Sequence, residues 1–419
     1  MSTQTVTIAS LGARGDGVAH DADGPVFVPY ALPGETVAIA RVKNEGTIMS
    51  FASTSPDRVQ PPCRHFGPDG DGGACGGCTL QHLAKSPYNA FKRQALINAL
   101  KSQALALPAE DAVDDTIEAH PGQRRRIVLT VRRRDGDLVI GFNQAETHYV
   151  VPTVECPITS AGIVSRLDAL KMIARASGCD VFRMVVTETL TGLDVSLEGV
   201  QGGLGERARR NVTDTVIRLR GIARVSINGE ILIEPEKPML DFGGARVVIP
   251  PGAFTQATRE AEEAMAALAI SHIGKAKRVA DLFSGIGTFA LRIGRSAAVH
   301  ALESDEKAVK ALDQAARTAK GLKPVTVERR DLFRRPMTPQ DLKPFDAVIF
   351  DPPRAGAEAQ CRELAKSSVK RIVAVSCNPL TLARDLAILT AGGYRITRVA
   401  PVDQFLWSSH VEAVVLLEK

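Results

Sequence analysis

The 419-residue sequence has few aromatic residues, no long apolar run and no basic, apolar segment in its first ten residues. Aromatic side chains make up only 5% of it, so the sequence gives no sign of extended base stacking along a single strand. No run of about 18 apolar residues is present to span a membrane, and the first ten residues lack the basic and apolar segments of a signal peptide. We therefore expect a cytoplasmic protein whose seven cysteines are thiols or metal ligands and not disulfides.

The excess of positive charge is small but concentrated. The formal net charge is +5, and arginines cluster at 124–126, 132–134 and 328–335. Such clusters fit contacts to nucleic-acid phosphates, whereas the alternative is a solvated basic face. The length predicts roughly two to four domains.

Three regions differ in pattern, which predicts a multidomain protein. Residues 1–58 contain short alternating apolar runs between Gly, Pro and Asp turns, which predict a small OB-like β-barrel; the segment GDGVAHDADGPVFVPYALPGETV resembles the TRAM domain of RNA-modifying enzymes. Residues 59–250 predict an α+β central domain, with a helix at about 86–107 that packs on the last domain. Residues 251–419 alternate strand-like and helix-like segments, which predicts a parallel, doubly wound, Rossmann-like sheet.

Ligands of doubly wound sheets bind where the strands end, so the residues there are candidates for a site. The first strand ends in DLFSGIGTF, where Gly285 and Gly287 allow a tight turn close to a ligand. Glu303, at the end of the next strand, can accept hydrogen bonds from ribose hydroxyls. Together they indicate a nucleoside-containing cofactor, although a glycine in such a turn can also be purely structural. The G-x-G is similar to the first motif of class I S-adenosylmethionine methyltransferases.

The next two strand ends carry an acid and a thiol. Asp351 begins a rigid Asp-Pro-Pro turn, and Cys377 follows the strand RIVAVS. Amino-methyltransferases have an aromatic ring after such a turn, but here the residue is Arg354. A cysteine in this crevice can attack C6 of a pyrimidine, which makes C5 nucleophilic toward a methyl donor. The alternative is that Cys377 is a small apolar filler.

Methylation at C5 also needs a base that removes the C5 proton. His410 and Glu412 lie near the end of the chain, before a final apolar strand, and alternation places them on one side of it. Either side chain has suitable chemistry, and either can instead be a polar residue at a strand edge.

Five segments together carry a family resemblance: GAFTQ, DLFSGIGTF, FDPPRAG, SCNPLTLARD and HVEAVVLL. They resemble the RNA uracil-C5-methyltransferase family, in the same order and over essentially the whole chain. The resemblance implies that Cys377 is the nucleophile and Glu412 the base. It also implies the cofactor-binding residues Gln256, Phe283, Thr288, Glu303, Asp331 and Asp351. At Thr288 and Asp331 the family more often has asparagine, and both substitutes can still form hydrogen bonds.

Four further cysteines have the pattern of a metal site. Cys63, Cys75 and Cys78 lie in a glycine-rich segment, and Cys156 precedes a proline. Four thiolates suit zinc or a [4Fe-4S] cluster. The ribosomal-RNA branch of the family carries C-x5-C-x2-C and a distant cysteine as cluster ligands, which favours the cluster here. In this sequence the first gap is eleven residues, which a glycine-rich loop can accommodate.

We therefore expect a monomeric, S-adenosylmethionine-dependent enzyme that converts uridine to 5-methyluridine in RNA. The barrel and the four cysteines resemble the branch acting on 23S rRNA, and tRNA is the alternative target. Two other functions remain open, methylation of an exocyclic amine through the DPPR turn and a non-catalytic role in RNA binding or assembly.

Overall fold

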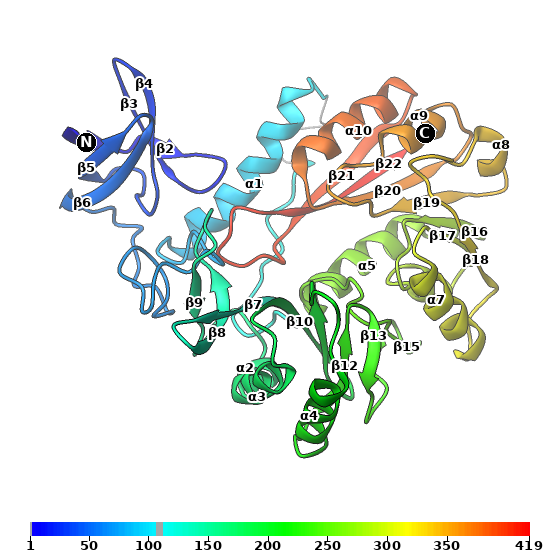
Figure 1. The fold of residues 1–419 in the computed structure, drawn as a ribbon. Helices are drawn as coiled ribbons and strands as arrows, with labels where there is room; N and C mark the ends of the chain where they lie inside the picture. The colour runs from blue at the N-terminus through cyan, green and yellow to red at the C-terminus, as the bar shows by residue number, and fades with distance from the viewer. Residues whose placement is uncertain (1, 106–111) are drawn as a thin grey trace.

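The computed structural model describes residues 2–105 and 112–419. Its N-terminal part is a six-stranded sheet at one end of the molecule, coloured blue in Figure 1. The strand order is β1-β5-β6-β4-β3-β2, and β1 and β2 are the outer strands. The strands are β1 (Ser2–Thr7), β2 (Ser10–Leu11), β3 (Gly17–Asp21), β4 (Gly24–Val28), β5 (Thr36–Val42) and β6 (Glu45–Ser53). This sheet lies within the predicted OB-like domain of residues 1–58; closure into a barrel and the TRAM identity stay predictions.

A segment without long regular elements joins this sheet to α1 (Lys85–Ser102). The predicted helix at 86–107 corresponds to α1, and its last two positions lie outside the described residues. Leu96, Ala99 and Leu100 of α1 are buried in the same core as the helices and strands of the C-terminal sheet. Figure 1 accordingly shows α1 beside α10. A helix that precedes the central sheet in sequence is thus part of the C-terminal fold.

The central part is a seven-stranded sheet of order β13-β12-β11-β10-β7-β8-β9. Its strands are β7 (Arg126–Arg134), β8 (Asp137–Asn143), β9 (Val150–Pro152), β10 (Val181–Thr189), β11 (Gly192–Glu198), β12 (Ile222–Ile227) and β13 (Glu230–Ile233). Three helices accompany it: α2 (Ala161–Val164), α3 (Leu167–Ser177) and α4 (Glu206–Ile217). Apolar residues of the sheet and the helices form one core. A short hairpin of β14 (Met239–Asp241) and β15 (Arg246–Val248) leads to the last part of the chain.

The C-terminal part is a doubly wound sheet of order β18-β17-β16-β19-β20-β22-β21, as the alternating pattern predicts. Its strands are β16 (Arg278–Leu282), β17 (Ala298–Glu303), β18 (Val325–Arg329), β19 (Ala347–Phe350), β20 (Arg371–Ser376), β21 (Arg395–Val402) and β22 (Glu412–Glu418). Its helices are α5 (Arg259–Ile273), α6 (Ala290–Ile293), α7 (Glu306–Thr318), α8 (Pro339–Leu342), α9 (Glu358–Ala365) and α10 (Pro379–Ala391). The sheet is not wholly parallel, because β22 runs antiparallel to both its neighbours.

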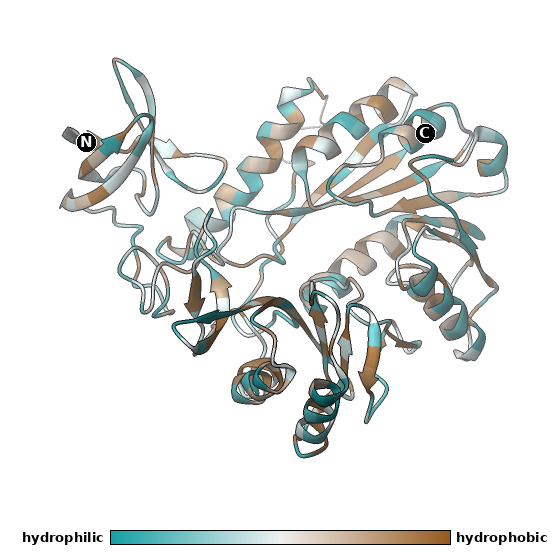
Figure 2. Ribbon diagram, viewed as in Figure 1, coloured by the Kyte–Doolittle hydropathy of each residue, from teal (hydrophilic) through white to brown (hydrophobic). Residues whose placement is uncertain are grey.

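Strands β19, β20 and β22 of the C-terminal sheet are buried along almost their whole length, and the strands of this sheet are largely brown, for hydrophobic, in Figure 2. Along β20, Val373 and Val375 belong to the core under α5, whereas Ile372 and Ala374 belong to the core under α10. A sheet buried on both faces leaves polar groups room mainly at its edges and strand ends. None of the helices in the described ranges is long and apolar enough to cross a bilayer.

Candidate active site and cysteine cavity

The strand ends of the C-terminal sheet meet the central part of the chain at a cavity of about 730 Å³. Nine of the residues predicted for the site line this cavity: Gln256, Phe283, Gly285, Thr288, Glu303, Asp331, Asp351, Cys377 and Glu412. The chain thus brings together residues that are spread over more than 150 positions in sequence. This is the arrangement expected at the strand ends of an open sheet.

The glycine turn after β16 and the acid at the end of β17 lie against each other. The Gly285 amide donates a hydrogen bond of 3.0 Å to Glu303 Oε2. The other carboxylate oxygen of Glu303 accepts from the amides of Ser304 and Asp305, at 2.7 and 2.8 Å. Phe283 has a φ of 61°, a left-handed conformation that bulky residues rarely adopt. A strained residue in a strand-end turn is typical of a binding site.

Gly287 differs from the other predicted cofactor residues because it is not among the residues lining the cavity. It has a φ of 98°, and a Cβ placed on it would lie 2.4 Å from Leu312 Cδ1 of α7. Its glycine is therefore required by backbone conformation and by close packing of α7 against the turn.

The thiol and the candidate base lie on neighbouring strands. In the antiparallel pairing of β20 and β22, Ser376 is opposite Ala413. Cys377 follows Ser376 at the end of β20, and Glu412 precedes Ala413 at the start of β22. The antiparallel register therefore places Cys377 and Glu412 side by side. Glu412 is the first residue of β22 and is only 2% exposed, whereas His410 precedes the strand and is exposed. Strand alternation does not extend to His410, but both side chains line the cavity.

A chain of buried hydrogen bonds joins the two acids of the cavity. Gln256 Nε2 donates to Asp351 Oδ2 at 2.8 Å, and Gln256 Oε1 accepts from Gln404 Nε2 at 2.9 Å. Gln404 Nε2 also donates to Glu412 Oε2 at 2.5 Å, while Gln404 Oε1 accepts from the Ala257 amide at 2.8 Å. Gln404 was not predicted from the sequence, where no motif marks it.

Asn378 and Pro379 shape the turn that carries Cys377. Asn378 caps α10, because its Oδ1 accepts from the Leu380 amide at 3.2 Å, and Pro379 occupies the first turn of the helix. Asn378 Nδ2 also donates to the carbonyl of Arg354 at 3.0 Å. The turn with the thiol is thereby tied to the turn with Asp351. A strand followed by Asn-Pro and an apolar helix is a sequence signal that would have predicted this cap.

Burial and mutual repulsion set the protonation of the site. Burial, with the nearby carboxylates of Glu412 and Asp351, raises the pKa of Cys377 to about 11. Burial also raises the pKa of Asp351 to about 7, although the hydrogen bond from Gln256 opposes it. The pKa of Glu412 is raised well above its ordinary value by burial and by Asp351, and the bond from Gln404 opposes the rise. Perturbed titrating groups in one cavity are typical of a catalytic site.

Phe254, Arg124 and Arg126 also line the cavity and were not predicted as active-site residues, although both arginines belong to the basic cluster 124–126. Phe254 is 70% exposed, although large aromatic side chains are usually buried. Arg126 is the first residue of β7, and Arg124 lies two positions before it. The cavity thus has basic and aromatic groups from outside the C-terminal sheet.

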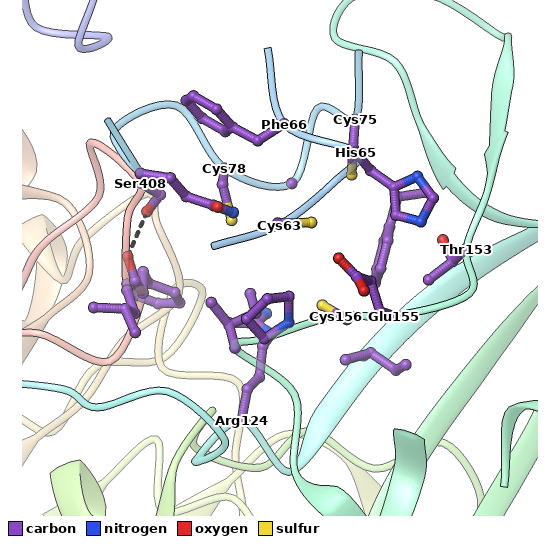
Figure 3. Close-up of a pocket in the computed structure, with 18 of the residues that line it drawn as sticks. Cys63, His65, Phe66, Cys75, Cys78, Arg124, Thr153, Glu155, Cys156 and Ser408 are labelled. Atoms are coloured by element: carbon purple, nitrogen blue, oxygen red, sulfur yellow. Dashed lines mark hydrogen bonds between the residues drawn. The ribbon is translucent and has the colours of Figure 1, made fainter. Parts of the chain in front are cut away.

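The four predicted metal-ligating cysteines line a second cavity, of about 270 Å³. Figure 3 shows Cys156 facing Cys63, Cys75 and Cys78 across the same space. Burial, followed by smaller contributions from the other thiols, raises the pKa of Cys75 to about 11 and that of Cys78 to about 12. No group of three or more His, Cys, Asp or Glu side chains in residues 2–105 and 112–419 is arranged to hold a single metal ion.

The two cavities share a wall. Arg124, Phe405 and His410 line both of them. The Arg124 guanidinium lies 6.0 Å from the centre of the Phe405 ring, and burial lowers its pKa while the Cys156 and Cys78 thiolates oppose that shift. A group in the cysteine cavity would therefore contact residues that also face the candidate active site.

Similarity to known proteins decides the family. The family described as tRNA (Uracil-5-)-methyltransferase matches residues 247–419. An RNA methyltransferase of Agrobacterium fabrum is 62% identical over 421 residues, which is 100% of both chains. A 23S rRNA (uracil(1939)-C(5))-methyltransferase of Halomonas elongata is 33% identical, covering 99% of this chain and 89% of that one.

The chain belongs to the RNA uracil-C5-methyltransferase family. The resemblance found in the five sequence segments is thereby confirmed. The fold of this methyltransferase is similar to that of a tRNA (uracil-54, C5)-methyltransferase of Pyrococcus abyssi solved with S-adenosyl-L-homocysteine. That similarity has a TM-score of 0.74 at 23% identity and covers 99% of both chains. The whole order of sheets is therefore shared and not only the Rossmann-like part.

Proposed function

We propose that the protein methylates C5 of a uridine in RNA, with S-adenosylmethionine as the methyl donor, Cys377 as the nucleophile and Glu412 as the base. The observation that carries this proposal is the strand register that places Cys377 beside Glu412 at one cavity with Asp351. An exocyclic-amine methyltransferase would have no use for a thiol and a base so arranged. A non-catalytic factor would need neither.

The first step is removal of the proton from Cys377 and attack of its sulfur on C6 of the uracil. The new S–C6 bond uses a lone pair of the sulfur. The C5=C6 π pair shifts to form a C4=C5 double bond, and the C4=O π pair moves onto the oxygen, which gives an enolate. With a pKa of about 11, Cys377 is a thiol at neutral pH, so its proton must pass to a base as the attack occurs. We assign this role to Asp351, which lines the same cavity, because its raised pKa of about 7 makes its carboxylate a better base than an ordinary aspartate.

When bound, S-adenosylmethionine supplies an electrophilic methyl group to C5. Glu303 and the Gly285 turn would hold its ribose, as their position at the ends of β17 and β16 indicates. Phe283 and Asp331 would complete this part of the cavity. Gln256, held between Asp351 and Gln404, is placed to bind the uracil edge or the donor.

The last step needs Glu412. Its carboxylate would take the C5 proton, the C5=C6 double bond would re-form, and the S–C6 bond would break to release Cys377. Burial favours the protonated form of Glu412, while the hydrogen bond from Gln404 favours the carboxylate. A buried carboxylate with a raised pKa has a high proton affinity, which favours removal of the C5 proton in this step.

For the second cavity we propose a [4Fe-4S] cluster held by Cys63, Cys75, Cys78 and Cys156. A single zinc ion needs ligands that converge at about 2.3 Å from one point, and among the described residues no group of three or more His, Cys, Asp or Glu side chains is so arranged. The four cysteines instead line one cavity of about 270 Å³. Iron would also offset the cost of ionising four buried thiols. Methyl transfer has no redox step, so the cluster would stabilise the fold around the shared wall.

Iron, sulfide and zinc analysis of protein purified without oxygen tests this assignment. About four irons and four sulfides per chain are expected, and Cys156→Ser should lower both. Stoichiometric zinc without sulfide would rule the cluster out.

A large ribosomal RNA is the substrate that we propose, because 23S rRNA is the substrate named for the Halomonas elongata relative. The arginine clusters and the N-terminal sheet would bind the surrounding RNA through its phosphates and shape. The target uridine must leave its stack to reach Cys377, and the exposed ring of Phe254 offers a surface for the flipped base. A tRNA is the alternative substrate.

The test is incubation of the protein with S-adenosylmethionine and a 23S rRNA fragment that contains 5-fluorouridine. Fluorine at C5 cannot leave as a proton, so the enzyme should remain in a denaturation-resistant methylated adduct. Cys377→Ala should abolish the adduct. An adduct that forms with tRNA and not with the 23S rRNA fragment would show that tRNA is the substrate. An adduct that still forms with Cys377→Ala would refute the mechanism.

A further inference from the structure

The connection between β21 and β22 carries Gln404 and ends at Glu412. We call residues 403–411 the β21–β22 loop. It has to bring the Gln404 amide to within 2.5 Å of the Glu412 carboxylate, across eight positions of sequence. The loop includes Trp407 with a φ of 58°, a conformation that an indole-bearing residue rarely adopts. Such a loop needs anchors outside itself to hold one conformation.

One anchor comes from the cysteine segment. The amides of Thr79 and Leu80, directly after Cys78, both donate to the carbonyl of Trp407, at 2.8 and 2.9 Å. They fix the tip of the loop.

The second anchor is the side chain of Lys92, on α1. Its ammonium is 0% exposed and donates to Asp403 Oδ1 at 2.9 Å and to the Phe405 carbonyl at 3.1 Å. It also donates to the carbonyl of His410. The three partners use the three hydrogens of the ammonium and come from both ends of the loop.

Tyr88, one turn earlier on α1, completes this anchor. Its hydroxyl donates to Asp403 Oδ2 at 2.7 Å and accepts from the Trp407 amide at 2.7 Å. The Phe405 amide donates to Asp403 Oδ1 at 2.9 Å. Both oxygens of the buried carboxylate are thus satisfied, and each is tied to α1.

A buried charge is costly unless paired, and Lys92 is paired with one carboxylate and two carbonyl dipoles. The carbonyl partners are the residue after Gln404 and the residue two before Glu412. Without the Lys92 ammonium, the carbonyl oxygens of Phe405 and His410 and the carboxylate of Asp403 would face one another with no hydrogen-bond donor between them. Their mutual repulsion would open the loop. The geometry of the Gln404–Glu412 hydrogen bond therefore depends on an ammonium that does not itself face the cavity.

We infer that Lys92 is a positioning residue for removal of the C5 proton: it fixes the β21–β22 loop so that Gln404 holds Glu412 as an aligned carboxylate base. The inference rests on the proposed function, because it assigns Lys92 to one step of that reaction. Lys92 touches neither Cys377 nor the glycine turn, so attack on C6 and methyl transfer should be affected less than proton removal.

The test compares variants on RNA with ordinary uridine and measures the share of enzyme held as methylated covalent adduct at steady state. The main variant is Lys92→Met with Asp403→Asn, which removes the cation without leaving a buried anion. We expect kcat to fall about tenfold or more, since a general base is worth about 10²–10⁴. The adduct should become the main enzyme form, and KM for S-adenosylmethionine should stay within about twofold.

Two companion variants separate positioning from folding. Lys85→Met, on the same helix, removes an exposed pair with Glu118 and should leave kcat and adduct at wild-type values. Tyr88→Phe keeps Lys92 but removes both hydroxyl bonds, and it should raise the adduct share in the same direction by a smaller factor. It supplies the measurement if the double variant does not fold.

Two results would overturn the inference, because each would show a general loss of structure. One is a loss of kcat without adduct in both Lys92→Met/Asp403→Asn and Tyr88→Phe. The other is a KM for S-adenosylmethionine that rises by the same factor by which kcat falls. Glu412→Gln serves as the reference for adduct accumulation. If wild-type enzyme traps 5-fluorouridine RNA and Glu412→Gln accumulates adduct while the two loop variants do not, only the role of Lys92 falls. If wild-type enzyme traps nothing, the proposed function falls first.

Discussion

Replacing Gln404 with leucine tests the hydrogen-bond chain of the cavity directly. Gln404 is 3% exposed and has three partners, the Ala257 amide, Gln256 Oε1 and Glu412 Oε2. Leucine has a similar volume, so the main effect is the loss of these bonds and not a new cavity. Each buried polar group left without a partner costs about 1–3 kcal/mol.

The sum for three groups is reduced because Glu412 can take up a proton and water from the cavity can reach part of the gap. We therefore expect the free energy of unfolding to fall by about 2–4 kcal/mol. Urea denaturation followed by circular dichroism measures it, provided that the multidomain chain unfolds in a resolved transition.

The same substitution should also impair catalysis. The bond from Gln404 opposes the rise in the pKa of Glu412, so its loss raises that pKa further and leaves less carboxylate at neutral pH. A hydrogen bond to a charged group is worth about 1.5–3 kcal/mol, which is about tenfold or more in the rate of proton removal. Because the group with the raised pKa ionises only at higher pH, the rate should recover as the pH increases.

Gln360→Leu is the matched control. Gln360 is equally buried and bonds to the Met337 amide and carbonyl at 2.8 and 3.1 Å, away from the cavity. It should lose comparable stability and accumulate no adduct. Gln404→Leu with unchanged unfolding energy and an unchanged pH profile would refute the role of the chain.

Three further predictions concern single positions. Gly287→Ala should lower the free energy of unfolding by about 2–4 kcal/mol, because position 287 has a positive φ and the new Cβ would clash with Leu312. In Gly285→Ala the new Cβ would meet no atom within 4 Å, so the loss should be about 1 kcal/mol. Equal losses in urea denaturation would contradict this. Iodoacetamide should alkylate Cys377 faster as the pH rises toward its pKa of about 11, because only the thiolate reacts; peptide mass spectrometry measures the rate, and a plateau below pH 9 would count against the raised pKa. Asn378→Ala removes the cap of α10 and should lower the free energy of unfolding by about 1 kcal/mol. A thermal melt measures this loss, and an unchanged melting temperature would contradict the role of the cap.

Much of the C-terminal part was predictable because its signals are local. Alternating strand and helix patterns gave the doubly wound sheet, and the residues that follow each strand face one cavity in any such sheet. Glu303, Asp351 and Cys377 could therefore be placed together without coordinates. The Asn-Pro that follows the strand also predicts a turn at Cys377, and the structure shows that Asn378 fixes it by capping α10.

Other features were not predictable, because they depend on contacts between distant segments. Gln404 lies in no motif, and only the closed β21–β22 loop shows that it bonds to Glu412. The sequence placed His410 in the last strand with Glu412, whereas β22 begins two residues later, although both residues line the cavity. Nothing in the sequence distinguishes Lys92 from an ordinary exposed lysine of a helix. The packing of α1 on the C-terminal sheet buries the Lys92 side chain.

The sequence by itself determined which chemical groups are available and the family to which they belong, since motifs, spacing and strand periodicity are properties of short segments. Only the tertiary structure decided which groups outside the predicted strand ends join them. The antiparallel β22 places Glu412 beside Cys377, and the packing of α1 places a buried cation under the loop that holds the candidate base. The physical reason is that a strand register and a buried ion pair are set by burial and hydrogen bonding across the whole fold, which no local pattern encodes.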